Sequence, residues 1–233
     1  MPIPSAGDWK MRLQGGWCRM SWKYRVKRVL RRCFAVHKSV YYRLDRTLVQ
    51  ESSNTTELTT ATGSEVSVDD IIRDLYNSNK KELAFYENYA RQGIEHWTAQ
   101  QNGKIVGVVW LYTGSYLAQW EGYEAWLLHI DIEPSAKFVC NVFTSSLLRG
   151  QGIFPFIAGR CFAEYPDSEF YSCVASNNKP SLRSHEKIGF RRYAAAYYFR
   201  LFQTTFCYFV TKGQRRFFRL PKGKAVSVSL IDQ

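Results

Sequence analysis

The feature that most constrains this chain is a pair of glycines, Gly150 and Gly152, set between a strand-like run and a helix-like run. Residues 136–144 are rich in aromatic and β-branched side chains, and residues 152–164 predict an amphipathic helix. Glycines at such a turn let a ligand approach the backbone, and the helix start offers unpaired N–H groups to an anion. The pattern predicts a site for an anion, most simply a pyrophosphate, to which Arg149 adds a positive charge. A glycine-rich turn that only caps the helix is the alternative.

A second segment, residues 178–190, has the form of a short helix followed by a strand. Pro180 suits the first turn of a helix and Gly189 suits its end. The preceding run, residues 169–175, predicts a strand. This order would place Asn178 and His185 near the carboxyl edge of that strand, where open α/β sheets bind ligands.

Together the two segments resemble the GNAT acyltransferases. Arg149-Gly150-Gln151-Gly152-Ile153 is similar to the Q/R-x-x-G-x-G/A loop of that family, and residues 178–190 are similar to its N-x-x-[AS]-x-x-[LI]-Y-E-K-x-G-F signature. Their order and their spacing, one helix plus one strand, also match. The resemblance covers about residues 68–202. It implies the acyl-CoA N-acyltransferase fold, acetyl-CoA as co-substrate, and direct transfer to an acceptor without a covalent enzyme intermediate.

The resemblance also implies where the donor binds. Backbone groups of residues 142–144 would pair with pantetheine, amides of the loop would hold the pyrophosphate, and Asn178 would bind the pantetheine arm or help to order the opening between the strands. The implied donor site comprises Val142, Phe143, Thr144, Arg149, Gly150, Gln151, Gly152, Ile153, Phe154, Asn178 and Ser181.

Two residues depart from the family pattern. Phe154 stands where the loop pattern ends in Gly or Ala, which predicts a wider loop or a different helix start. His185 stands in place of the Tyr that protonates the departing thiolate. Because histidine titrates near neutral pH, His185 could donate that proton. The alternative is that no such donor is needed, since a coenzyme A thiolate leaves without much help.

The remaining catalytic and acceptor-binding candidates lie in residues 120–133. His129, Asp131 and Glu133 alternate and would share one face of a predicted strand over 125–132. Facing a cleft, one of them could relay a proton; facing solvent, they are plain polar alternation. The aromatic loop before them could line an acceptor pocket, although Trp and Tyr also serve as ordinary cap residues. Its candidate residues are Trp120, Glu121, Tyr123 and Glu124.

The expected fold is α/β (α+β): a mixed, mostly antiparallel sheet of about seven strands flanked by helices. Helices are predicted over 67–77 and 80–92, and a hairpin joins 96–101 to 104–112 through Asn102-Gly103. A loop is predicted over 114–124. Further strands are predicted over 39–48, 190–202, 204–210, 215–220 and 225–230. The expected organisation is a basic extension over 1–47, with a helix over 22–36 and the first strand, a Ser/Thr-rich linker over 48–67, and a GNAT-like domain over 68–233.

The distribution of net charge along the chain indicates which classes of binding partner to expect. The net charge of +12 divides into +10 over residues 1–46, −7 over 47–182 and +9 over 183–233. Basic ends favour anionic partners, and the basic amphipathic run 22–36 suits an anionic membrane surface; a solvated face is the alternative. Nucleic acid is a less favoured partner, and a dimer is left open. No apolar run is long enough to span a bilayer and no signal peptide is evident, so a cytoplasmic location, peripheral on the inner membrane face, is expected.

The six cysteines are scattered without a CxxC pair, so neither a metal site nor a disulfide framework is expected, and Cys140 and Cys173 are predicted to be core residues. The resulting hypothesis is an acetyl-CoA-dependent enzyme that acetylates an amine or hydroxyl of a small molecule, such as an amino sugar or a lipid-linked or polysaccharide precursor. One alternative is a catalytically weak module that binds an anionic membrane or nucleic acid. Another is transfer of a longer acyl or an aminoacyl group on the same fold.

Overall fold

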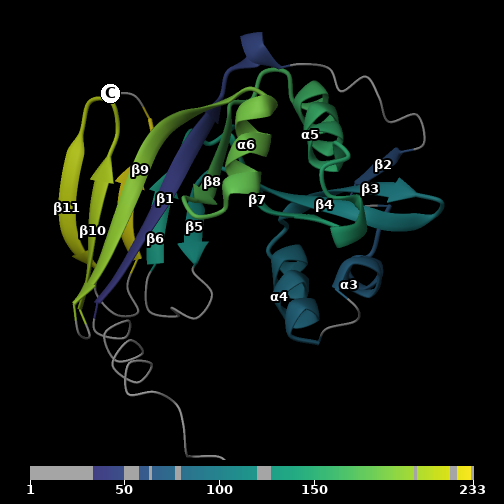
Figure 1. Cartoon of the computed structure of the whole chain (residues 1–233), viewed down its shortest axis with the longest axis horizontal. Coiled ribbons are helices and arrows are strands. Elements are labelled where there is room, and N and C mark those ends of the chain that lie inside the picture. The colour runs from purple at the N-terminus through teal and green to yellow at the C-terminus, as the bar shows by residue number, and fades with distance from the viewer. Residues whose placement is uncertain are drawn as a thin grey trace, which may run out of the picture.

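The computed structural model describes residues 34–49, 58–62, 65–76, 80–119, 127–201, 204–220 and 225–231. Within these residues, nine strands form one sheet in the order β11-β10-β9-β1-β8-β7-β4-β3-β2, and three more form a small sheet in the order β12-β6-β5 (Figure 1). The strands of the large sheet are β1 (Phe34–Leu44), β2 (Thr59–Thr62), β3 (Glu95–Gln101), β4 (Lys104–Thr113), β7 (Lys137–Thr144), β8 (Phe170–Ala175), β9 (Phe190–Leu201), β10 (Thr204–Val210) and β11 (Arg215–Leu220). Those of the small sheet are β5 (Tyr116–Gln119), β6 (Leu127–Asp131) and β12 (Ala225–Ser229).

The large sheet is antiparallel throughout except for the pair β7 and β8, which run parallel. The mixed, mostly antiparallel sheet expected from the sequence is therefore confirmed, although it has more strands than the expected seven. The additional strand β2 falls in the expected linker, and β5 falls in the expected loop over 114–124.

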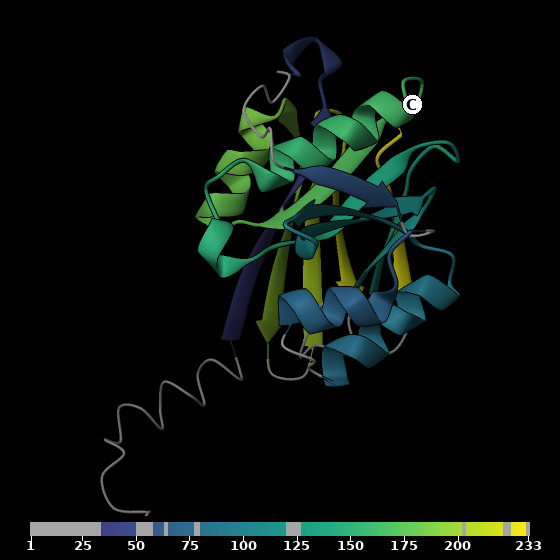
Figure 2. The same cartoon turned by 90° about the vertical axis from the view of Figure 1, so that its right-hand side faces the viewer.

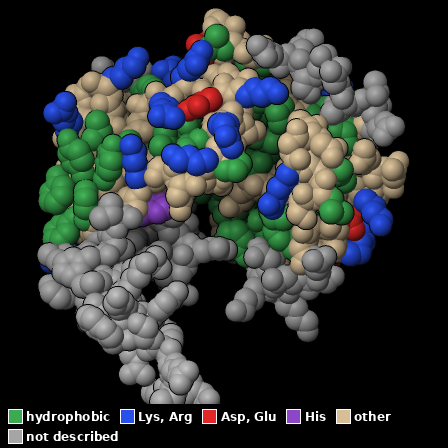
Figure 3. All heavy atoms as spheres, viewed as in Figure 1, with side chains coloured by type: hydrophobic (Ala, Val, Ile, Leu, Met, Phe, Trp, Pro, Cys, Tyr) green, Lys and Arg blue, Asp and Glu red, His purple; other side chains and the backbone are tan. Residues whose placement is uncertain are grey.

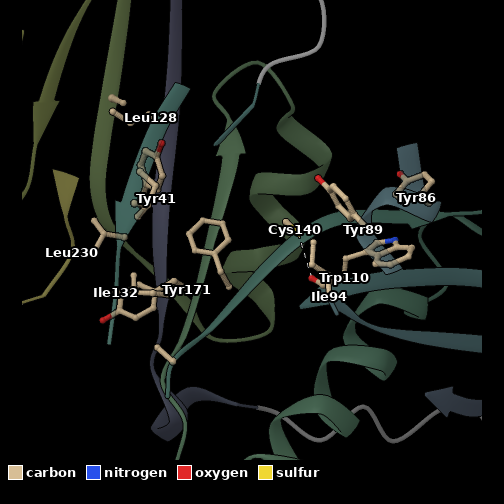
Figure 4. Close-up of a cluster of buried hydrophobic side chains, with 14 of the residues drawn as sticks. Tyr41, Tyr86, Tyr89, Ile94, Trp110, Leu128, Ile132, Cys140, Tyr171 and Leu230 are labelled. Atoms are coloured by element: carbon tan, nitrogen blue, oxygen red, sulfur yellow. Dashed lines mark hydrogen bonds between the residues drawn. The ribbon is translucent and has the colours of Figure 1, made fainter. Parts of the chain in front are cut away.

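The helices lie in two layers. The helices α3 (Val68–Tyr76) and α4 (Lys80–Arg91) cover one face of the sheet, and α5 (Ile153–Glu164) and α6 (Lys179–Lys187) cover the other. In Figure 2 the sheet is seen between these two pairs of helices. The small sheet packs on the α3–α4 face, where its Leu128 and Ile130 join the same buried cluster as Ile71. Figure 4 shows part of this cluster, with Tyr41 and Leu128 in one group and Tyr89 and Trp110 in another.

Local signals in the sequence fix several element ends. The Ser67 hydroxyl accepts a hydrogen bond from the amide of Asp70 at 3.1 Å and so caps the start of α3. Asn102 and Gly103 have φ angles of 53° and 73°, as a tight two-residue hairpin turn requires. Both the helix start and the β3–β4 hairpin are as predicted.

The first strand is central rather than peripheral. β1 lies between β8 and β9, and its Tyr41 and Tyr42 side chains are fully buried. The residues of this strand, assigned from the sequence to an N-terminal extension, therefore belong to the same sheet as the domain expected over 68–233. The helix predicted over 22–36 reaches only residues 34–36 of the described chain, and these are strand; its remainder lies outside the described residues. No helix among the described residues is long and apolar enough to cross a bilayer.

Candidate active site

The most unusual feature of the large sheet is the separation of its two parallel strands. β7 and β8 pair only at Lys137 with Phe170, Phe138 with Tyr171 and Val139 with Ser172. Beyond that point β7 continues beside β4, and β8 continues beside β1. Within the described chain, the edge of residues 140–144 that faces β8 therefore has no strand partner, and its backbone groups are available to a ligand.

A bulge in β7 accompanies this separation. Val108 pairs with Phe143 and Trp110 with Cys140, so one residue of β4 faces two residues of β7. Asn141 takes a φ of 44° at this point, and its side-chain amide donates to the Tyr89 hydroxyl of α4 at 2.7 Å. Bulges bend a strand and increase its twist, and they are frequent beside active sites. The bulge thus explains why the end of β7 turns away from β8.

The glycine turn lies at the end of this unpaired edge. A short 3-10 helix (Ser146–Leu148) follows β7, and α5 then begins at Ile153 with Gly152 as its N-cap. Gly150 and Gly152 have φ angles of 83° and 82°, which residues other than glycine rarely adopt. A Cβ atom at either position would meet nothing within 4 Å. The turn therefore leaves open space above the backbone.

The amides of this turn point to anion binding. In the described part of the chain, no protein acceptor receives the amides of Gly150, Gly152, Ile153 or Phe154. Such groups at a helix start carry partial positive charge and bind phosphate. Arg149 lies beside them with its guanidinium 5.8 Å from the centre of the Phe143 ring, and its Nε donates to the Thr144 carbonyl at 3.4 Å. The Gln151 side chain is exposed.

The side chain of Phe154 does not enter the turn. It is 6% exposed and packs its ring 4.9 Å from the imidazole of His185, between α5 and α6. The departure at this position therefore fills the core instead of widening the loop. On the other side of α5, a Cβ at Gly107 of β4 would lie only 2.5 Å from Ile153 Cγ2. The first turn of α5 thus rests directly on the backbone of β4.

Helix α6 starts on the other side of the opening. The Asn178 side-chain oxygen accepts from the amide of Ser181 at 3.3 Å, and both residues follow closely on the end of β8. Asn178 is exposed and Ser181 is half-buried. The structure therefore uses the Asn178 oxygen as a helix cap at the edge of the opening.

Comparison with known proteins bears on the fold. No protein-family model and no curated protein matches the sequence. A conserved protein of unknown function from Staphylococcus epidermidis has a similar structure, with a TM-score of 0.50 and 12% identity over 84% of this chain and 81% of that one. A GNAT-family acetyltransferase from Colwellia psychrerythraea has a TM-score of 0.46 and 13% identity over 68% of this chain, which spans only 53% of that protein. A GCN5-related N-acetyltransferase-like protein from Streptococcus suis has a TM-score of 0.45 and 14% identity over 78% and 68% of the two chains.

Two features decide the architecture. A parallel pair of strands separates within an otherwise antiparallel sheet, and a glycine turn beside it begins a helix. The chain has the GNAT acyltransferase fold. At 12% identity, the likeness to the Staphylococcus epidermidis protein concerns the fold and says nothing about the substrate.

In this GNAT fold, His185 points into the protein. It is 2% exposed, its Nδ1 lies 2.8 Å from the Ser181 carbonyl, and its Nε2 lies 2.9 Å from the Ser172 hydroxyl of β8. The carbonyl can only accept, so Nδ1 carries the proton and Nε2 accepts from Ser172. Burial lowers the pKa of His185 to about 4. Since the ring is neutral at pH 7 and both nitrogens have partners, this geometry does not favour the proton-donor role expected from the sequence.

The burial of His185 predicts a pH-dependent stability. Its pKa is about 4 in the folded chain and 6.5 in the reference state, so the unfolded chain binds the extra proton first. The associated stability is full above pH 6.5, falls as the pH drops, and has been lost by about pH 4, for a total of about 3 kcal/mol. The unfolding free energy, measured by denaturant titration at a series of pH values, should fall less steeply between pH 6.5 and pH 4 for His185→Gln than for the unmodified chain. An equal pH dependence of the unfolding free energy in the two proteins would exclude this buried neutral histidine as a source of acid sensitivity.

The other three catalytic candidates lie on or just beyond β6 of the small sheet. Leu128 and Ile130 of β6 are buried against the large sheet, so the alternating His129 and Asp131 face the opposite side. The side chains of these two residues are 37% and 39% exposed, and His129 Nδ1 lies 2.9 Å from Asp131 Oδ1. Glu133 is exposed beyond the end of β6, so the three do not share one strand. The solvent-facing interpretation of this alternation is the one that the structure supports.

Aromatic and thiol groups line the α4 side of the separated strands. Tyr89 packs its ring 5.5 Å from that of Tyr112, and burial raises the pKa of Tyr112 to about 12. Burial likewise raises the pKa of Cys140 well above its usual value and that of Cys173 to about 12, so both thiols are protonated at neutral pH and are poor nucleophiles. The expected acceptor residues Trp120, Glu121, Tyr123 and Glu124 lie outside the described residues. Among the described residues, no cluster of His, Cys, Asp or Glu could hold a metal ion.

The space-filling view shows that the surface is hollowed near its centre, between the half that carries β8–β11 and the half that carries β4 (Figure 3).

Sequence reasoning missed the bulge at Asn141 and the hydrogen bond to Tyr89, because a left-handed backbone conformation at one asparagine within an aromatic run produces no periodic pattern in the sequence. The nearest signal was the single polar residue in the apolar run 138–143.

Proposed function

We propose that this chain is an acyl-CoA-dependent acyltransferase that moves an acetyl group directly to an amine or hydroxyl. The observation that carries the proposal is the coincidence of two features. The unpaired edge of β7 leads straight into a turn in which the amides of Gly150, Gly152, Ile153 and Phe154 have no acceptor within the described chain, while the Gln151 amide donates to the Leu148 carbonyl at 3.3 Å. One ligand that carries both a diphosphate and an extended amide-containing arm would satisfy both sets of groups.

The residues of the turn fit the diphosphate of coenzyme A. Open space above Gly150 and Gly152 admits the phosphates, and the amides of Gly150, Gly152, Ile153 and Phe154 are the donors that would hold them. Arg149 would add a fixed positive charge, and Gln151 a side-chain amide at the rim. Because the first turn of α5 rests on Gly107, these amides are held rigidly and need little reorganisation on binding.

The edge of β7 fits the pantetheine arm. Backbone groups of Val142, Phe143 and Thr144 would pair with the amides of the arm as an extra strand does, and Asn178 and Ser181 border the opening from α6. The bound thioester would supply the activated acyl group. Backbone amides near the bulge would stabilise the negative charge that develops on its carbonyl oxygen.

Transfer is proposed to be direct. The thiols of Cys140 and Cys173 are protonated and partly or wholly buried, so neither provides a covalent route. His185 is committed to Ser172 and Ser181, and His129 and Asp131 face away from the large sheet. We therefore assign no general acid or base among these residues, and we expect an acceptor whose amine is already neutral near the working pH, or a base from the segment around Glu121 and Glu124.

The acceptor is proposed to be a small or lipid-linked molecule such as an amino sugar. The support is the aromatic character of residues 120–126 and the cationic C-terminal third of the chain. Transfer of a longer acyl or an aminoacyl group is the second candidate, because the turn and the β7 edge would bind coenzyme A whatever its acyl chain.

The test is release of free thiol from acyl-CoA in the presence of pooled amine and amino-sugar acceptors. Acceptor-dependent thiol release is expected with acetyl-CoA, and the Gly152→Trp variant should abolish it. Release that is faster with long-chain acyl-CoA would favour the second candidate. No acceptor-dependent release, together with no coenzyme A binding in calorimetry, would contradict the proposal and leave a binding module.

A further inference from the structure

The C-terminal strands carry an aromatic face that no described helix covers. In β10 the residues Thr205, Cys207 and Phe209 are buried, the last two in the same cluster as Leu128 and Ile130 of the small sheet, while the residues between them are only half-buried. The helices α5 and α6 cover the same face of the sheet as the half-buried residues of β10, but these helices lie over other strands. Helix α6 packs on the first residues of β9, where Phe190 meets His185. The later part of β9, together with β10 and β11, therefore presents one finished core face and one face without a helical layer (Figure 1).

The aromatic side chains of this face stand in register across the strands. Tyr197 of β9 pairs with Tyr208 of β10, which pairs with Phe217 of β11. In the next row Phe199 pairs with Phe206. We call these five residues the aromatic belt. Phe217 is 65% exposed and Phe199 is 38% exposed, and both are among the few large apolar side chains so exposed in the described chain.

Cations border the aromatic belt at both ends of its rows. Lys38 of β1 lies over the Tyr197 ring, with Nζ 4.7 Å from the ring centre. At the other edge Arg219 pairs with Phe206, and Arg215 pairs with Val210. Residues 187–231 contain ten lysines and arginines and not one acidic residue. Figure 3 shows hydrophobic side chains gathered at the left edge of the molecule with Lys and Arg side chains around them.

We propose that the aromatic belt and its cations form a docking surface for an anionic phospholipid bilayer. Aromatic rings flanked by lysine and arginine match the membrane interface, where rings enter the headgroup region and cations meet lipid phosphates. A cationic edge strand alone is explained by the need to prevent edge-to-edge pairing, but that need does not account for exposed phenylalanines. The inference does not depend on the acyltransferase function.

Ring geometry favours a bilayer over single-stranded nucleic acid. The rings of Phe206 and Phe217 are parallel within 8°, with centres 5.7 Å apart, which is too close for rings lying side by side in one plane. They are therefore offset-stacked, and each covers part of the other's face. Lys38 covers a face of Tyr197. Nucleobases need open ring faces to stack on, whereas a bilayer interface accepts ring edges. A second copy of the chain is disfavoured, because a two-fold contact would bring Arg215 and Arg219 close to like charges.

The experiment is co-sedimentation of the full chain with phosphatidylcholine vesicles that contain or lack phosphatidylglycerol. Binding is expected only with the anionic lipid and should fall with added salt. Arg215→Glu combined with Arg219→Glu should weaken it by at least about twentyfold, since each charge near an anionic surface contributes roughly a factor of five. Phe217→Ser should weaken it about fivefold through the lost apolar contact.

Matched controls separate this surface from the rest of the chain. Arg91→Glu, on α4 at the opposite face of the sheet, and Ile231→Ser, at an exposed apolar residue outside the belt, should leave vesicle binding within twofold of the unmodified chain, about the scatter of such contributions. Vesicle binding that survives the belt substitutions, or that is absent altogether, overturns the proposal. So does a belt substitution that weakens binding of an oligouridylate but not of vesicles, or one that changes the sedimentation velocity of the chain without affecting vesicles.

Discussion

Gly152→Trp is expected to abolish coenzyme A binding while leaving the chain folded. Gly152 has a φ of 82° and nothing within 4 Å of where its Cβ would lie, so an indole would stand in the open space in front of the turn. It would also disturb the amides that we assign to the diphosphate. Loss of two charge-assisted hydrogen bonds, worth roughly 1.5–3 kcal/mol each, should weaken binding at least about a hundredfold. Isothermal titration with acetyl-CoA measures this directly.

Gly93→Trp is the matched control for strain. Gly93 follows α4 with a φ of 70° and also has nothing within 4 Å of its Cβ position. Both variants should lose a similar amount of unfolding free energy, about 1–3 kcal/mol for a left-handed residue other than glycine. Only the change at Gly152 should affect the donor. Unchanged affinity in Gly152→Trp, or equal losses in the two variants, would remove this turn from the donor site.

Gly107→Ala is expected to destabilise the fold and loosen the donor site together. The new methyl group would lie 2.5 Å from Ile153 Cγ2 and 3.2 Å from Ile157 Cδ1. Cγ2 is attached to the Cβ of Ile153 and cannot swing away freely, so the first turn of α5 must shift. Overpacking of this kind costs about 1–3 kcal/mol, and the shift displaces the amides that would hold the diphosphate. Denaturant unfolding and donor titration on the same variant measure both effects.

Gly159→Ala provides the control of opposite sign. Gly159 lies within α5 with nothing near its Cβ position, so alanine there should stabilise the chain by about 0.5–1 kcal/mol without changing donor affinity. Combining Gly107→Ala with Ile153→Ala removes the clashing methyl group. The double variant should therefore be more stable than the sum of the single changes by about 0.5–3 kcal/mol. Strict additivity would show that α5 does not rest on β4 in the way described.

The sequence predicted those parts of the fold that depend on local chemistry. The starts of α3 and α5 follow from Ser67 and Gly152, which cap their helices in the structure, and the start of α6 follows from Pro180, which lies in its first turn. The β3–β4 hairpin follows from Asn102-Gly103. These signals act over a few residues, so a single sequence contains all the information that they need.

Features that depend on distant partners were not predictable in the same way. β5 forms in an expected loop because Tyr116 stacks on Phe138 of β7, 4.1 Å away between ring centres, and because the strand pairs with β6. His185 looked like a titrating group, yet packing by Phe154 and Phe190 makes it a neutral core residue. The rows of the aromatic belt likewise became visible only when the register of β9, β10 and β11 was known.

Hydrogen exchange of backbone amides with and without coenzyme A tests the central claim most directly. On addition of coenzyme A, exchange should slow at the amides of Gly150, Gly152, Ile153 and Phe154 and along residues 142–144, because the first set would donate to the diphosphate and the second would pair with the pantetheine arm. Amides of the β3–β4 hairpin should not change. Protection confined to other segments, or no protection at concentrations of coenzyme A that saturate any observed binding, would contradict the account.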